Sequence, residues 1–444
     1  MASTDNVDRE IIPLHSRSSE QFSANIPGSK SLTNRALILA AMHPGRTVID
    51  NALHADDTDL LAECLGSFEG LTVEGTEDGY EVERRAGVLG APDAPIYIGA
   101  AGTPARFLLS FAADAEGTTE ITGNARLSER PMGHLLDAMR RLGIGLSCEG
   151  RPDCLPVRVT GSPSAGTDWS IDGSVSSQFV SSLLLHAARR PPGSEPVTVR
   201  VSGHLVSRPY VEMTEQAMRE AGIDVEALDG DAWRVVPGEP TADRLEVETD
   251  ASGMSYFLAA AAMTGTSVRV DRVGRLSRQG DVGFAEVLGR MGAEVAIEDD
   301  HIVVTGTGTL RGIEVDMETM PDTVLTLAAV AAFADGPTRV TNIANLRVKE
   351  CDRIAAIVNE LGRMGVPTSD GEDWVEIRPD GRPGPARVET YDDHRVAMAF
   401  ALVGLLVPGI VITDPDCVRK SFPTFWNEFD RFAAHHVAAR HDAA

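Results

Sequence analysis

The chain has 444 residues, of which 43 % are hydrophobic and 24 % are charged, and its formal net charge is −26. This length predicts two domains, because single hydrophobic cores stop growing well below it, and the composition is that of a folded soluble protein. The strong negative charge argues against nucleic acid and anionic membranes as partners. Two uncharged stretches, residues 251–268 and 396–413, contain glycine or proline and are interpreted as buried helices that run into a turn, not as membrane spans.

Six segments of the chain repeat one pattern: a polar entry, a helical run rich in Ala and Leu, a Gly or Pro break and a β-branched strand. They begin 70 to 76 residues apart, at Ser31, Thr103, Ser176, Ser252, Asp322 and Asp393. A second, amphipathic helix follows in the repeats, for example from His134, Phe284 and Ile354. Short β-branched runs come next, such as residues 302–304 and 375–377. Six such units predict an α/β protein with two lobes of three units each.

The first helix of each repeat is apolar on nearly all sides, which predicts that it lies in the core of its lobe. Its N-terminus presents free N–H groups and partial positive charge, which suit phosphate and carboxylate ligands. Ordinary helix capping would explain Ser, Thr and Asp at these openings. It does not explain the added basic or amide side chains, which are Lys30, Arg35, Arg106, Gln178 and Arg395. We therefore expect the helix openings of the two lobes to bind anionic groups across a cleft.

A second polar loop precedes the second helix in several repeats. These loops contain Asn124 to Arg126, Ser207 to Tyr210, Asn345 to Arg353, and Arg419 to Ser421. Only three of the forty formal cations are lysine, namely Lys30, Lys349 and Lys420, and all three fall in the loops described here. An ammonium group is compact and can shift its pKa, whereas a guanidinium group is planar and always charged. The placement of the lysines therefore favours a role in anion binding or proton transfer.

Neither the five cysteines nor the eleven histidines have a spacing typical of a metal site. We therefore predict no metal and no cofactor. Scattered cysteines in odd number are typical of a reducing compartment, and the acidic N-terminal residues lack the apolar core of a secretory signal. The sequence thus predicts a cytoplasmic protein.

Taken together, these motifs resemble the enolpyruvyl transferases, and within them the branch that acts on shikimate-3-phosphate. The resemblance is carried, in chain order, by Gly28-Ser29-Lys30-Ser31, Asn34-Arg35, Ala101-Gly102-Thr103, Arg106, Ser176-Ser177-Gln178-Phe179, Ser207-Arg208-Pro209-Tyr210, Pro321-Asp322, Asn345, Arg347-Val348-Lys349-Glu350, Asp352-Arg353, Asp393-His394-Arg395-Val396-Ala397-Met398 and Lys420-Ser421-Phe422-Pro423. It implies two inverted α/β lobes, each of three repeated units around buried parallel helices, with the active-site cleft between the lobes. The lobes would be residues 29–248, and residues 1–28 together with 249–444.

The resemblance implies that the chain transfers the enolpyruvyl group of phosphoenolpyruvate to the 5-hydroxyl of shikimate-3-phosphate and releases phosphate by addition and elimination. This reaction belongs to the shikimate pathway, which leads to chorismate and the aromatic amino acids and is the target of the inhibitor glyphosate. We expect a monomer that binds small molecules only. Two positions depart from the common family pattern: Ala100 replaces Asn and Phe107 replaces Pro. Both flank Gly102 and so bear on the fit of the phosphoenolpyruvate phosphate and of glyphosate.

By the same resemblance, two sets of residues would bind the substrates. Shikimate-3-phosphate would contact Lys30, Ser31, Arg35, Ser176, Ser177, Gln178, Ser207, Tyr210, Asp322, Asn345 and Lys349. Phosphoenolpyruvate would contact Lys30, Gly102, Arg126, Gln178, Arg353, Arg395 and Lys420. Substrates with phosphate and carboxylate groups need several fixed cations, and planar guanidinium groups suit carboxylates.

Addition and elimination need an acid and a base near one carbon atom. Asp322 and Glu350 are the candidate carboxylates, and Lys30 is a further candidate for proton transfer. Which carboxylate serves which step stays open. The alternative for this pair is structural, with Asp322 as a helix cap and Glu350 as an ion-pair partner.

Three other functions fit the sequence less well. Enolpyruvyl transferases that act on UDP-N-acetylglucosamine commonly have a cysteine in the loop of the second repeat, and residues 112–132 contain none. A repeat scaffold that binds a partner on its concave face needs no converging lysines and no acid–base pair. A nucleotide-binding P-loop protein needs GxxxxGK[ST], which Gly28-Ser29-Lys30-Ser31 does not match.

Overall fold

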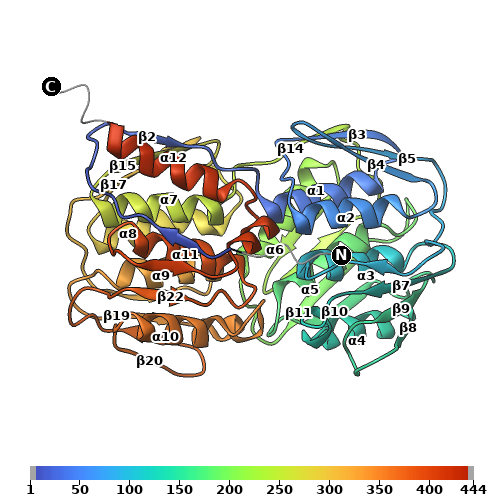
Figure 1. Ribbon diagram of the computed structural model, residues 1–444. Coiled ribbons are helices and arrows are strands. Elements are labelled where there is room, and N and C mark those ends of the chain that lie inside the picture. Colours follow the sequence, from blue (N-terminus) through green and yellow to red (C-terminus); the bar gives the residue numbers. More distant parts are fainter. Residues whose placement is uncertain (1–6, 439–444) are drawn as a thin grey trace. The chain divides into compact units, whose positions relative to one another are not determined.

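The computed structural model describes residues 7–438, and helices alternate with strands along nearly all of it (Figure 1). The chain divides into two compact units. One is Gly28–Glu248, and the other combines the described parts of Met1–Pro27 and Thr249–Ala444. We call them the 28–248 unit and the 249–438 unit, the latter including residues 7–27. No helix in the described part of the chain is both long enough and apolar enough to cross a membrane.

The 28–248 unit contains three repeats of the same element order. The first is α1 (Lys30–Met42), β3 (Gly45–Asp50), α2 (Asp56–Gly66), β4 (Leu71–Thr76) and β5 (Gly79–Arg84). The second is β6 (Ile96–Tyr97), α3 (Gly102–Ala112), β7 (Thr118–Thr122), η1 (Leu127–Glu129), α4 (Gly133–Arg141), β8 (Gly145–Cys148) and β9 (Val157–Thr160). The third is β10 (Asp168–Asp172), α5 (Ser177–Ala188), β11 (Val197–Ser202), α6 (Pro209–Glu220), β12 (Val225–Leu228), β13 (Ala232–Val235), followed by β14 (Arg244–Glu246).

The 249–438 unit repeats the pattern. Its first repeat is β2 (Phe22–Ala24), α7 (Ala251–Thr264), β15 (Ser267–Asp271), η2 (Gly280–Gly283), α8 (Phe284–Met291), β16 (Glu294–Ile297) and β17 (His301–Thr305). Its second is β18 (Glu314–Asp316), η3 (Pro321–Thr323), α9 (Val324–Ala331), β19 (Thr338–Thr341), η4 (Ala344–Val348), α10 (Arg353–Arg363), β20 (Thr368–Asp370) and β21 (Val375–Ile377). Its third is β22 (Ala386–Val388), α11 (His394–Gly404), β23 (Ile410–Ile412), η5 (Pro415–Lys420) and α12 (Phe425–Ala438), with β1 (Arg9–Ile11).

The strands of the described residues form six small sheets, and the five four-stranded ones share one topology. In the second repeat the order is β6-β7-β9-β8, with the first pair parallel and the others antiparallel. The remaining four-stranded sheets follow the same order, and in two of them the first strand comes from a distant part of the chain. β14 pairs in parallel with β3, and β2 pairs in parallel with β15. Each of these strands lies just before a segment that connects the two units, so both connecting segments begin from a paired strand.

The sixth repeat differs from the strand, helix, strand, helix, strand, strand pattern predicted for all six. Among the described residues its sheet has three strands, β1-β23-β22. β22 pairs in parallel with β23, and the antiparallel neighbour of β23 is β1, from the other end of the chain. The N-terminal strand thus joins the C-terminal sheet. The last element, α12, takes the place of the missing hairpin in the chain order.

The six buried helices predicted from the sequence are all present, as α1, α3, α5, α7, α9 and α11. In α7 and α11 every residue is buried, and in α1 burial is continuous from Leu32 to Met42. Each unit has its own apolar core built on three of these helices. A helix that is apolar on all sides can bury every face only when sheets and other helices surround it, which confirms the α/β fold class.

The two segments that cross between the units are fixed by hydrogen bonds within each unit. Inside the 28–248 unit, the Ser29 N–H donates to the Glu248 carbonyl at 2.8 Å. Inside the 249–438 unit, the Asp250 N–H donates to the Pro27 carbonyl at 2.9 Å. A Cβ atom at Gly28 would lie 1.8 Å from the carbonyl oxygen of Asn51, so only glycine permits this close approach of two backbones.

Candidate active site

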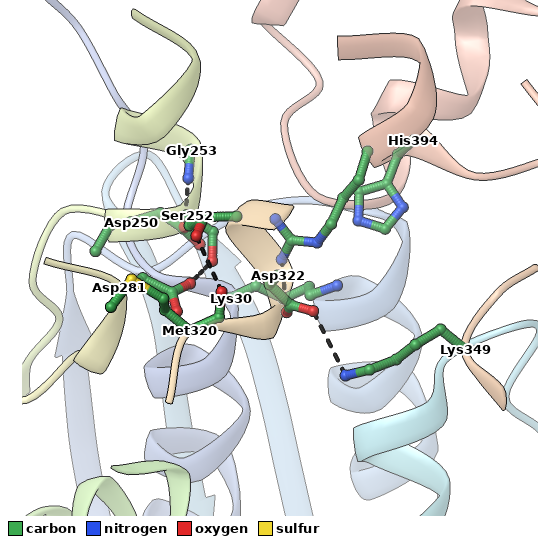
Figure 2. A network of polar contacts seen from close by, with 12 residues as sticks. Lys30, Asp250, Ser252, Gly253, Asp281, Met320, Asp322, Lys349 and His394 are labelled. Carbon is green, nitrogen blue, oxygen red and sulfur yellow. Dashed lines mark hydrogen bonds and ion pairs between the residues drawn. The ribbon is translucent and has the colours of Figure 1, made fainter. Parts of the chain in front are cut away.

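Asp322 is the centre of a charged cluster in the 249–438 unit. It lies in η3, directly before the buried helix α9. Oδ1 lies 3.5 Å from Nζ of Lys349 (Figure 2). The same oxygen lies 3.0 Å from Nη1 of Arg353, and Oδ2 lies 3.0 Å from Nη2 of Arg395. Burial by itself would raise the pKa of Asp322, but the cations, led by Arg395, outweigh burial and hold it well below its usual range. Asp322 is therefore an ionised carboxylate at neutral pH.

Arg353, the first residue of α10, joins three carboxylates. Besides Asp322, its Nη2 lies 3.1 Å from Oε2 of Glu350, and its Nε lies 2.8 Å from Oδ2 of Asp393. Burial alone would lower the pKa of Arg353, but these carboxylates, led by Asp393, raise it. Glu350 also lies 3.4 Å from Nζ of Lys420. The loop before α10 and the openings of α9 and α11 therefore meet at one network of alternating charges.

Local structure explains why Asp393 and Arg395 point into this network. Asp393 is the N-cap of α11, and its side chain accepts a hydrogen bond from the Arg395 N–H at 2.9 Å. The Arg395 guanidinium is directed to Asp322 and also lies 3.4 Å from the hydroxyl of Tyr256 on α7. Burial raises the pKa of Tyr256 to about 12, so this hydroxyl stays neutral.

A second buried carboxyl, Asp281 in η2, lies in the same unit and is not among the residues predicted from the sequence. Its Oδ2 accepts a hydrogen bond from the hydroxyl of Ser252 in the first turn of α7 (Figure 2). Its Oδ1 is buried and has no hydrogen-bond partner among the described residues. Burial first, and then the charge of Asp322, raise the pKa of Asp281 to about 7. Below pH 7 this group therefore mostly holds a proton that Asp322 lacks.

In the 28–248 unit the helix openings carry the cations. Lys30 is the first residue of α1, and its Nζ lies 3.3 Å from Oδ2 of Asp57 on α2. Arg35, one turn further on, is almost fully buried and donates to the hydroxyl of Thr214 at 2.7 Å and to the carbonyls of Ser31 and Tyr210 at 2.7 and 2.8 Å. Burial lowers the pKa of Arg35 to about 10. These contacts make Arg35 a link between α1 and α6, and its predicted contact with substrate stays a prediction.

Aromatic rings connect the openings of α1, α3 and α5. The guanidinium of Arg35 lies 5.5 Å from the ring centre of Phe107, and that of Arg106 lies 5.8 Å from the ring centre of Phe179. Phe107 is thus a buried support for Arg35.

Gly102 begins α3 between two guanidinium groups. A Cβ atom placed on Gly102 would lie 2.6 Å from Nη1 of both Arg106 and Arg130. Arg130 is only 7 % exposed. Arg126, the arginine predicted from the sequence, has a side chain that is 39 % exposed and lies 3.3 Å from Glu129. The loop therefore places Arg130 against the opening of α3, and the role of Arg126 stays a prediction.

The third helix opening carries hydroxyl and amide groups. Ser176 caps α5 and accepts from the Gln178 N–H at 3.3 Å. Oε1 of Gln178 is buried and makes no hydrogen bond to any residue in the described part of the chain. Ser177 is buried next to it, and Ser207 adopts a positive φ of 53° just before α6, which contains Tyr210.

The comparisons with known proteins fit this arrangement. The family model of EPSP synthase (3-phosphoshikimate 1-carboxyvinyltransferase) matches residues 19–429. The chain belongs to the EPSP synthase family. The 3-phosphoshikimate 1-carboxyvinyltransferase of Pseudoalteromonas translucida is 40 % identical, over 91 % of this chain and 95 % of its own length. That of Paraburkholderia phytofirmans is also 40 % identical, over 96 % of this chain and 99 % of its own.

A solved structure of EPSP synthase from Acinetobacter baumannii superposes with a TM-score of 0.78 at 27 % identity, covering 95 % of this chain and 97 % of the other. The EPSP synthase fold therefore accounts for the described residues of both units. Of the predicted site residues, the structure brings together Asp322, Lys349, Glu350, Arg353, Arg395 and Lys420 in one unit. Asn345 lies in η4, in the loop that leads to them.

Proposed function

We propose that this EPSP synthase family member transfers the enolpyruvyl group of phosphoenolpyruvate to the 5-hydroxyl of shikimate-3-phosphate and releases phosphate. The family membership supports the reaction. The observation that carries the chemistry is the convergence of Lys349, Arg353 and Arg395 on the single carboxylate Asp322. An ionised carboxylate among cations can accept a proton while the cations hold anionic substrates.

In the addition step, the 5-hydroxyl oxygen bonds to C2 of phosphoenolpyruvate, its proton leaves, and the methylene carbon gains a proton. We assign the base to Asp322, because the surrounding cations keep it ionised. The elimination step breaks the C2–O bond to phosphate and removes a proton from the methyl group. Glu350, which lies between Arg353 and Lys420, and Lys30 remain the candidates for the proton at the methyl carbon.

The guanidinium groups of Arg353 and Arg395 would bind the carboxylate of phosphoenolpyruvate, since two planar donors suit that group. Gly102, at the N-terminus of α3, would receive the phosphate, because the helix opening offers free N–H groups next to Arg106 and Arg130. Gln178, whose buried amide oxygen has no hydrogen-bond partner among the described residues, would accept from a substrate hydroxyl. Ser176, Ser177, Ser207 and Asn345 would complete the polar contacts to shikimate-3-phosphate.

The proposed enzyme acts in the cytoplasm as a monomer. All five cysteines are free thiols, which fits a reducing compartment. Gel filtration at assay concentration tests the oligomeric state.

The test of the reaction is phosphate release from purified protein. We expect inorganic phosphate only when phosphoenolpyruvate and shikimate-3-phosphate are both present, and equal rates before and after dialysis against a chelator. Equal turnover with UDP-N-acetylglucosamine in place of shikimate-3-phosphate would reject the proposed acceptor. Loss of activity on chelation that a divalent ion restores would reject a metal-free mechanism.

A further inference from the structure

The turn that leads into α11 has an unusual backbone. Tyr391 and Asp392 both have positive φ, 57° and 55°, and the Asp393 N–H donates to the Thr390 carbonyl at 2.9 Å. A four-residue turn with two central residues of positive φ is of the I′ kind, which favours Asn-Gly and similar pairs. Asp tolerates this conformation, but a bulky aromatic residue adopts it only when its surroundings hold it there.

Glu360, on α10, provides the contacts that hold this turn. Its side chain is fully buried, at 0 % exposure. Oε1 accepts a hydrogen bond from the Tyr391 hydroxyl at 2.6 Å, and Oε2 accepts from the Glu389 N–H at 3.1 Å. Arg363, one turn further along α10, lies 3.1 Å from Glu360 and balances its charge. Burial, followed by the hydrogen bond to Glu360, raises the pKa of Tyr391 to about 12, so the phenol remains a donor.

The turn is followed at once by residues of the charged cluster. Asp393 pairs with Arg353, and Arg395 reaches Asp322. α10 therefore touches this segment at two places, through Arg353 at its N-terminus and through Glu360 two turns later. The first contact involves Arg353, which is assigned to substrate, but neither Glu360 nor Tyr391 in the second contact has such an assignment.

We propose that Glu360 is a positioning residue for enolpyruvyl transfer: through Tyr391 and the Glu389 amide it fixes the 390–393 turn, and thereby the placement of Asp393 and Arg395. The inference rests on the proposed function, in which Arg395 and Arg353 bind phosphoenolpyruvate. Loss of the contact would let the turn relax toward negative φ, and the N-terminus of α11 would shift with it. The effect should fall on phosphoenolpyruvate more than on shikimate-3-phosphate.

The first test uses Tyr391→Phe, which removes only the hydroxyl, and Glu360→Gln. We expect KM for phosphoenolpyruvate to rise about tenfold or more in both, while the Kd of shikimate-3-phosphate, measured by titration calorimetry, stays within threefold. Thr264→Val is the matched control. It also removes one buried hydroxyl of the same unit, which donates to the Ala260 carbonyl at 2.7 Å near the end of α7, and it should leave both constants unchanged.

A second test separates positioning from general stability. Glycine adopts positive φ without strain, so Asp392→Gly should stabilise the turn without help from Glu360. In a double-mutant cycle, Tyr391→Phe should then raise KM for phosphoenolpyruvate by less than threefold in the Asp392→Gly background. Thermal melting of every variant confirms that assays are made on folded protein.

Two results would overturn the inference: an unchanged KM for phosphoenolpyruvate in both Tyr391→Phe and Glu360→Gln, or an equal rise in Thr264→Val. If Tyr391→Phe cost as much in the Asp392→Gly background as alone, the turn would not be the element through which Glu360 acts. If the wild-type protein did not turn over shikimate-3-phosphate, the proposed function itself would be rejected. The wild-type assay therefore tests the function separately from the role of Glu360.

Discussion

Nζ of Lys349 lies 3.5 Å from Oδ1 of Asp322, so an ammonium group touches the carboxylate assigned as the base. The other two lysines also lie against carboxylates, Lys30 against Asp57 at 3.3 Å and Lys420 against Glu350 at 3.4 Å. All three side chains are at most 20 % exposed. Every lysine of the described chain therefore lies in a confined site with a carboxylate within ion-pair distance.

We predict that Lys30→Arg, Lys349→Arg and Lys420→Arg each keep the fold and the charge but lower kcat/KM at least tenfold, because a planar guanidinium does not fit a compact site built for an ammonium. Lys30→Arg should be the most severe, since Lys30 is assigned to both substrates. Arg290→Lys is the control. Arg290 is exposed on α8 and donates to the Glu314 carbonyl. Values within about threefold of wild type for all three lysine variants would contradict the assignment.

Asp322→Asn and Glu350→Gln should lower kcat by roughly 10²–10⁴-fold, the usual scale for general acid–base catalysis. Since cations hold the pKa of Asp322 well below its usual range, its ionisation should not appear in the pH–rate profile between pH 5 and 8. Rapid-quench kinetics and a pH series of kcat measure both effects. A near-normal kcat in either amide variant would reassign that residue to charge balance.

Arg130 and Arg126 give a direct comparison of two arginines in one loop. Arg130→Gln should raise KM for phosphoenolpyruvate by about tenfold or more, because the buried Arg130 guanidinium lies next to Gly102. Arg126→Gln should change it by less than threefold, since its partly exposed side chain pairs with Glu129 in solvent. Steady-state kinetics at saturating shikimate-3-phosphate distinguish them. The reverse order of effects would restore Arg126 as the substrate contact.

Asp281 predicts a specific pH dependence of stability. Its pKa is about 7 in the folded chain and near 3.8 when unfolded, so between these values the folded state keeps a proton that the unfolded state has lost. The free energy of unfolding contributed by this group is therefore largest below pH 4 and falls as the pH rises toward 7. Each pKa unit corresponds to about 1.4 kcal/mol.

Asp281→Asn removes this titration, so the variant should gain stability relative to wild type between pH 5 and 8, by on the order of 1–3 kcal/mol. Urea midpoints measured across that range test the prediction. Asp299→Asn, at an exposed position between β16 and β17, should retain the wild-type pH dependence. Parallel curves for wild type and Asp281→Asn would mean that Asp281 is ionised throughout.

The sequence was most informative where the signal is local. The runs that form α7 and α11 are apolar on every side and longer than an ordinary strand, which is the pattern of a buried helix. The loop from Asn345 to Arg353 could be assigned to the site because its charges are dense, and the structure does bring Lys349, Glu350 and Arg353 to Asp322. The individual substrate contacts came from family resemblance and remain predictions.

What could not be predicted depends on packing between distant segments. Which arginine of the 126–130 loop is buried depends on how η1 packs: Leu127 is buried and Arg130 is only 7 % exposed, whereas the Arg126 side chain is 39 % exposed. The burial of Asp281 depends on the packing of η2 against α7. The pairing of β1 with β23 joins residues about 400 positions apart, and the sequence between them contains no signal of register.

The hydrogen bonds at the two segments that connect the units hold the chain ends of each unit next to each other. Ser29 and Glu248 are joined directly, as are Pro27 and Asp250. A gene fragment that encodes residues 28–248 would therefore produce a polypeptide whose ends already meet, and a short linker from Pro27 to Thr249 would bridge the remaining unit. Excised in this way, the two halves of the enzyme could be made, labelled and mixed as separate proteins.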